Sequence, residues 1–115
     1  MGIIEAFVAA NTAGVDLQTL YEVLSTSAGG SASLNYAVPD FIIPRRFQEG
    51  FSVDMLCKDL DLALQMGKDL HASLLMPAVA RQTFELARTA GMGDWNVTSA
   101  TLALEAVRRA KDNDA

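Results

Sequence analysis

Apolar residues recur every three or four positions along most of this chain, which is the period of amphipathic α-helices. The first apolar stripe covers residues 3–10 and ends near Gly14, whose residue type is typical of the position after a helix C-terminus. No capping residue precedes the stripe, and less than one turn of chain lies before it. The pattern therefore predicts a helix that is the second half of a longer one.

Two shorter helices come next, with a small, glycine-rich turn between them. Asp16 is a suitable N-cap for the first of them, which stops at residues 25–31. Such a turn either connects helices or lets a ligand approach the backbone closely, and both interpretations stay open. Residues 31–38 predict a short helix that Pro39 stops, and residues 40–50 predict irregular structure.

The longest helix is predicted for residues 53–70. One of its faces is polar, with residues at helical spacings of three and four: Asp54, Lys58, Asp61, Gln65 and Lys68. A second stripe is apolar and is predicted to be buried: Met55, Leu62 and Met66.

Asp59 falls within this apolar stripe, and Lys58 precedes it. A buried carboxylate without a partner costs several kcal/mol, so Asp59 needs one. It serves either as a salt bridge or cap for a neighbouring loop, or as a group that orients a ligand-binding residue. Lys58 is either a solvated lysine whose stem covers apolar neighbours, or a partner for a cofactor phosphate or nicotinamide. The residues alone leave both choices open.

The remaining pattern predicts two more helices. Pro77 suits a first helical position, and that helix runs to Gly91. Asn96 suits the N-cap of a final helix with apolar positions from Ala100 to Val107. The sequence therefore predicts one all-α domain over residues 1–115, a bundle of five or six helices.

The composition narrows the possible partners. Half of the residues are hydrophobic and 20% are charged, which suggests a helical unit that also buries a face against something else. The net charge of −5 argues against nucleic acid and anionic membranes, since both select clustered Lys and Arg. No apolar run approaches the ~18 residues of a membrane span, and the N-terminus lacks the basic start of a signal peptide. We expect a cytoplasmic protein.

No set of residues in this chain forms a complete active site. Cys57 and His71 are the only cysteine and histidine, so we expect no intrachain disulfide, no metal site and no Ser-His-Asp triad. Cys57 is predicted to be a buried structural thiol. No G-x-G-x-x-G motif follows a predicted strand, so nothing here is expected to cradle a dinucleotide pyrophosphate.

Several short motifs follow one another along the chain: Phe47, Gly50-Phe51, Asp54, Lys58-Asp59-Leu60, Leu62-Ala63-Leu64, Met76-Pro77 and Gly91-Met92-Gly93-Asp94. This succession resembles the C-terminal helical domain of the β-hydroxyacid dehydrogenases, which include 3-hydroxyisobutyrate dehydrogenase and tartronate semialdehyde reductase. The resemblance covers essentially the whole chain. Its most specific part is the Lys58-Asp59-Leu60 element after the Gly-Phe pair.

The resemblance implies a fold like the C-terminal domain of 6-phosphogluconate dehydrogenase. In the family this domain accompanies an N-terminal Rossmann domain that binds NAD or NADP. The lysine that acts as general acid/base precedes the matched segment. The resemblance thus implies that these 115 residues lack both the Rossmann domain and any catalytic residue. The isolated chain is expected to be inactive.

Site roles are carried over to individual residues of this sequence. Lys58 is expected to contact the cofactor near its nicotinamide end, with Phe51 and Asp59 lining or bracing the active site. Gly29, Gly30 and Ser31 are expected to border the substrate pocket. The implied substrate is a small β-hydroxyacid of the 3-hydroxyisobutyrate or tartronate semialdehyde type, and the implied assembly is a homo-oligomer.

Two other hypotheses stay open. One is a stand-alone, non-catalytic helical module for dimerisation or partner binding, which the apolar composition permits. The other is an imine-reductase-like relative, which shares the architecture but differs in its catalytic residues.

Overall fold

The computed structural model describes the backbone of residues 1–113 and the side chains of residues 1–110. Within this part of the chain all regular structure is helical, with one isolated antiparallel bridge between Ser52 and Asn96. The α-helices are α1 Gly2–Thr12, α2 Leu17–Ser25, α3 Ala32–Ala37, α4 Val53–Asp69, α5 Leu75–Thr89 and α6 Ala100–Asn113. A π-helix, Val38–Ile42, continues α3, and a 3₁₀ turn, Val97–Ser99, leads into α6. The prediction of an all-α domain with five or six helices is confirmed.

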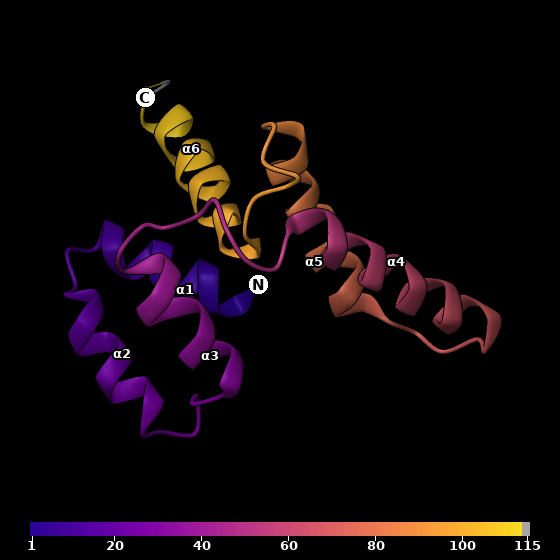
Figure 1. The fold of residues 1–115 in the computed structure, drawn as a ribbon, viewed down its shortest axis with the longest axis horizontal. Helices are drawn as coiled ribbons and strands as arrows, with labels where there is room; N and C mark the ends of the chain where they lie inside the picture. Colours follow the sequence, from indigo (N-terminus) through magenta and orange to yellow (C-terminus); the bar gives the residue numbers. More distant parts are fainter. Residues whose placement is uncertain (114–115) are drawn as a thin grey trace.

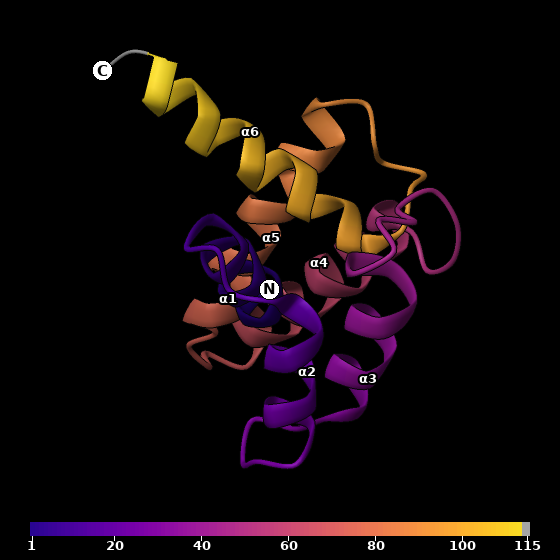
Figure 2. The same cartoon turned by 90° about the vertical axis from the view of Figure 1, so that its left-hand side faces the viewer.

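The helices form two groups that meet at α6. In Figure 1, α1, α2 and α3 gather on one side, and α4 and α5 project from the other side as an antiparallel hairpin, which lies behind the first group in Figure 2. Helix α6 contacts both α1 and α5. The buried core follows this seam: it includes Phe7 of α1, Val53 and Cys57 of α4, Phe84 of α5 and Ala100 of α6.

The predicted helix caps are present. The Asp16 carboxylate accepts hydrogen bonds from the Thr19 N–H and hydroxyl, and these bonds lower the pKa of Asp16. Gly14 follows α1 with φ +80°, the left-handed conformation that glycine adopts without penalty. Asn96 accepts the Thr98 N–H, although it caps the 3₁₀ turn rather than α6 itself.

Two predicted boundaries are wrong, both at prolines. Pro39 does not stop the helical path, because the backbone widens there into the π-helix, in which the Ile43 N–H donates to the Val38 carbonyl. Pro39 lies in the first turn of that helix, where its missing N–H is not needed. Pro77 is the third residue of α5 rather than the first, for the same reason: no N–H of the first turn has an intrahelical partner.

Cys57 is buried in α4 with 2% of its surface exposed, as predicted for a structural thiol. Loss of solvent raises the pKa of the Cys57 thiol, because the thiolate would have to form away from water.

We predict that iodoacetamide at pH 8 alkylates Cys57 at least tenfold more slowly in the folded protein than in the urea-unfolded chain. The thiol is both inaccessible and disfavoured as thiolate, which is the nucleophilic form. Mass spectrometry of the time course measures the two rates. Equal rates would contradict the burial of this side chain.

Candidate functional site

The start of α4 is fixed by pairing between two segments far apart in sequence. The Val53 and Asp54 N–H groups donate to the carbonyls of Trp95 and Gly93, at 2.9 and 2.8 Å. In the other direction, the Val97 N–H donates to the Phe51 carbonyl at 2.8 Å. These bonds satisfy N–H groups that the first turn of a helix leaves without partners. Residues 51–54 are therefore held in place by the segment that leads into α6.

Beneath this pairing lies a buried amide. The Asn96 side chain is fully buried, and its Nδ2 donates to the Tyr36 hydroxyl at 2.9 Å. The Phe51 N–H reaches the same hydroxyl at 3.4 Å. Gly50 has φ +106°, and a Cβ there would lie 2.7 Å from Asn96 Nδ2 and 3.0 Å from the Tyr36 hydroxyl. Only glycine fits between these groups, so Gly50 is a structural requirement of the site.

Two predicted site residues, Lys58 and Asp59, lie in the second turn of α4, and a third, Phe51, lies just before the helix. Lys58 and Asp59 are both exposed, and Phe51, one residue before the Ser52 cap, is 37% exposed. Of these three residues, only Lys58 lines a shallow pocket of about 320 Å³, which is also lined by Asp54, Cys57, Asp61, Leu62 and Arg88.

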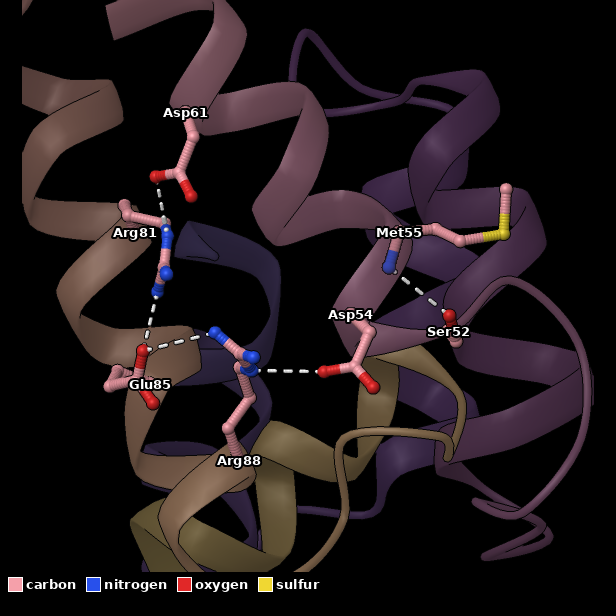
Figure 3. A network of polar contacts seen from close by, with 7 residues as sticks. All are labelled: Ser52, Asp54, Met55, Asp61, Arg81, Glu85 and Arg88. Carbon is pink, nitrogen blue, oxygen red and sulfur yellow. Dashed lines mark hydrogen bonds and ion pairs between the residues drawn. The ribbon is translucent and has the colours of Figure 1, made fainter.

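A network of ion pairs joins α4 to α5, as Figure 3 shows. Arg88 Nε donates to Asp54 at 2.9 Å, and Arg81 Nε donates to Asp61 at 2.8 Å. Glu85 accepts from both arginines, at 2.9 Å from Arg81 and 3.4 Å from Arg88. These bonds to Asp61 and Glu85 raise the pKa of Arg81, so its charge is permanent.

Lys58 lies between the two aspartates on the same helix face but makes no hydrogen bond or ion pair with any described residue. Its ammonium group therefore remains available to a ligand. The sequence pattern identified the polar face of α4 correctly but gave no indication that arginines of α5 would take both neighbouring carboxylates.

The apolar stripe of α4 is exposed, and the prediction that it is buried is wrong for this chain. Met55, Leu62 and Met66 are 57–62% exposed, and Asp59 among them is exposed as well. The reason is geometric: these residues lie roughly half a turn away from Val53, which faces the core. Asp59 is hence not an unpaired buried charge, and it has no partner among the described residues.

The glycine-rich turn lies apart from these residues. It joins α2 to α3 at the end of that pair away from α4, as both views show (Figures 1 and 2). The Ser31 hydroxyl oxygen accepts the Leu34 N–H at 3.0 Å and caps α3. At Gly30 a Cβ would lie 2.9 Å from the Ser25 carbonyl, so the close approach that requires glycine is internal to the turn. Phe51, Lys58 and Asp59 thus lie at the start of α4, whereas Gly29, Gly30 and Ser31 lie apart from them.

The described residues contain neither a metal-binding cluster nor a membrane-spanning helix. No group of three His, Cys, Asp or Glu side chains among them is placed to hold a metal ion. No helix in this part of the chain is long and apolar enough to cross a membrane.

Comparison with known proteins gives a consistent result. A family model described as NAD-binding of NADP-dependent 3-hydroxyisobutyrate dehydrogenase matches residues 1–104. The 2-(hydroxymethyl)glutarate dehydrogenase of Eubacterium barkeri is 37% identical over 89 residues, covering 77% of this chain and 30% of the relative. A probable mitochondrial 3-hydroxyisobutyrate dehydrogenase-like protein of Arabidopsis thaliana is 33% identical over 105 residues, covering 91% of this chain and 31% of the relative.

Solved structures agree with the sequence matches. The 3-hydroxyisobutyrate dehydrogenase of Salmonella typhimurium superposes with a TM-score of 0.80 at 26% identity, covering 87% of this chain and 35% of that one. The chain thus spans about a third of the length of the relatives that it matches.

We predict that Gly50→Ala lowers the free energy of unfolding by about 2–3 kcal/mol, because a left-handed backbone strain and a steric clash with Asn96 and Tyr36 add together. Gly14→Ala is the matched control: Gly14 also has a positive φ but has no atom within 4 Å of the added Cβ. It should cost about 1 kcal/mol. Urea denaturation measures both, and equal losses would show that Gly50 is constrained by φ alone.

Proposed function

The chain belongs to the NAD(P)-dependent 3-hydroxyisobutyrate dehydrogenase family, and we propose that it forms the helical domain that closes over the nicotinamide and the substrate. The observation that carries this proposal is the unpaired ammonium group of Lys58 at the edge of a pocket. A free cation beside two neutralised carboxylates suits a phosphate or carboxamide oxygen of a dinucleotide. The residues present therefore fit the family's cofactor.

Each exposed residue at the start of α4 has a proposed task. NAD(P) bound to the whole protein supplies hydride chemistry. Lys58 donates hydrogen bonds to it near the nicotinamide end, and the half-exposed Phe51 ring excludes water from that side. Asp59 accepts a hydrogen bond from whatever donor covers the apolar stripe, since covering it without one would cost free energy.

We propose that the glycine-rich turn, Gly29 to Ser31, contacts only part of the substrate. Ser31 uses its oxygen as the cap of α3, and its O–H still remains able to donate to a substrate carboxylate. Gly29 and Gly30 would border the same pocket. Because the turn lies away from Lys58, it serves only a substrate that extends past α3, or one that a further part of the protein brings against it.

The proposed substrate is a small β-hydroxyacid of the 3-hydroxyisobutyrate or tartronate semialdehyde type. We assign no general acid/base within residues 1–115, and that group typically contributes ~10²–10⁴-fold to rate. The Rossmann domain and the catalytic lysine of the proposed enzyme are supplied from outside these residues. The 115 residues alone should show no turnover of hydroxyacid with NAD or NADP.

The alternative, a module for dimerisation or partner binding, is favoured by one separate observation. The outer part of the α4–α5 hairpin exposes large apolar side chains, from 57% to 76% each: Leu62, Met66, Leu70, Leu75, Met76 and Val79. The chain's accessible surface is 7,102 Å², whereas a compact monomer of 12.3 kDa has about 6,100 Å². The excess is comparable to the ~800 Å² that each partner buries in a stable interface. We propose that a second copy of the chain covers this hairpin, in a homo-oligomer of the enzyme or of a free-standing module.

The enzyme proposal predicts that Lys58 matters to cofactor use. In a chimera, the 89 residues of this chain that match the E. barkeri relative replace their counterpart in that protein. There Lys58→Gln should raise the KM for NAD(P) about tenfold, because a charged hydrogen bond to the cofactor is lost. Lys68→Gln, an exposed lysine on the same helix, should change it less than twofold. Equal effects of the two variants in an active chimera would remove the assigned role of Lys58.

The oligomer proposal predicts a dimer of the chain in sedimentation velocity at micromolar concentration. Leu62→Glu with Val79→Glu should convert it to a monomer, because each substitution places a charge in the apolar contact. Val23→Glu is the matched control, since Val23 is 60% exposed on α2 and lies outside the hairpin. A wild-type chain that sediments as a monomer at all concentrations would exclude this contact.

A further inference from the structure

We infer that Arg81 and Arg88 are positioning residues that keep Lys58 free for its ligand by pairing with Asp54, Asp61 and Glu85. The identity of the ligand, a pyridine dinucleotide, rests on the proposed function. The role of the arginines rests on the geometry of α4 and α5 and stands apart from it.

The charges on the two helices form complementary series. Asp54, Lys58 and Asp61 give one face of α4 the order minus, plus, minus, and Arg81, Glu85 and Arg88 give α5 the order plus, minus, plus. Because the helices are antiparallel, Asp54 pairs with Arg88 and Asp61 pairs with Arg81. We call these six residues the charge ladder. If the pairing continued along both helices, Lys58 would pair with Glu85.

That middle pair is absent from the structure. Glu85 accepts instead from the two arginines on its own helix, which are four residues before it and three residues after it. Of the six charged side chains in the ladder, Lys58 alone makes no ion pair. Arg81 is the best-placed member to enforce this arrangement, since its side chain is only 14% exposed and it donates to both Asp61 and Glu85.

Loss of the arginines would release three competitors for Lys58. Asp54 lies four residues before it, the favourable orientation for a helical ion pair, and Asp61 lies three residues after it. Glu85 would face it from α5. The pocket beside Lys58 is lined by two carboxylates and two cations, so its charged groups balance. Without Arg88 the balance becomes negative and repels phosphate.

The test is competitive acetylation of the 115-residue chain with limiting acetic anhydride at pH 8. Mass spectrometry measures the modification of Lys58 relative to Lys68, ten residues further along α4 and so about 15 Å away, beyond the screening length at 0.1 M salt. An ammonium held in an ion pair loses its proton less readily and is acetylated more slowly. In Arg81→Gln/Arg88→Gln the Lys58-to-Lys68 ratio should fall about threefold, from the summed effect of several weak pairs.

Four further variants make the result specific. Arg46→Gln/Arg109→Gln removes the same charge away from the ladder and should leave the ratio within about 1.3-fold of wild type. Glu85→Gln should also leave it unchanged, because Glu85 does not hold Lys58. Adding Asp54→Asn, Asp61→Asn and Glu85→Gln to the double arginine variant should restore the wild-type ratio. If the ratio had fallen only because α4 had moved, removing these carboxylates would not restore it. Arg88→Gln alone, at a 40% exposed side chain, gives a smaller fall of the same sign if the double variant does not fold.

An unchanged ratio in folded Arg81→Gln/Arg88→Gln, or a rise in Glu85→Gln, would overturn the inference. Protection of Lys58 by millimolar NADP⁺ in the active chimera described above, which includes the rest of the E. barkeri relative, tests the proposed ligand separately. A threefold fall without such protection would support the role of the arginines and count against the proposed function. Protection that is weaker in the double arginine variant supports both.

Discussion

The structure depends on how the first turn of α4 is anchored. Its N–H groups donate to carbonyls of residues 93 and 95, and the buried Asn96 amide ties the same segment to Tyr36 of α3. A helix N-terminus held by another segment's backbone has little freedom to rotate about its axis. This anchor therefore decides which residues of α4 face the core, which face α5 and which stay exposed.

The rest of the hairpin follows from that orientation. With Val53 and Cys57 facing inward, Asp54 and Asp61 are directed toward the arginines of α5, and Met55, Leu62 and Met66 are directed outward. The same rotation that pairs the aspartates leaves Lys58 between them without a partner. One backbone anchor thus determines both the free cation and the exposed apolar stripe.

Local chemistry was predictable from the sequence, and long-range pairing was not. The caps at Asp16 and Asn96, the glycine after α1 and the buried Cys57 follow from side-chain type and helical period, and the structure has all of them. The π-helix at Pro39 was missed because a proline's effect depends on the turn in which it lies. The ion pairs of Arg81 and Arg88 were missed because charge order on one helix does not specify the facing helix.

The exposed apolar stripe of α4 shows the same limit of prediction from sequence, because the pattern on one helix does not specify what lies against it. Periodicity correctly placed Met55, Leu62 and Met66 on one face, but it could not distinguish a face covered within the chain from one covered by something else. Asp59 makes this distinction chemically important. An aspartate in the middle of an exposed apolar stripe costs little free energy while water solvates it. Covering the stripe removes this water, and an unpaired carboxylate then costs several kcal/mol. Whatever covers α4 must therefore bring a hydrogen-bond donor to Asp59, and this requirement selects among partners that apolar contact alone would accept.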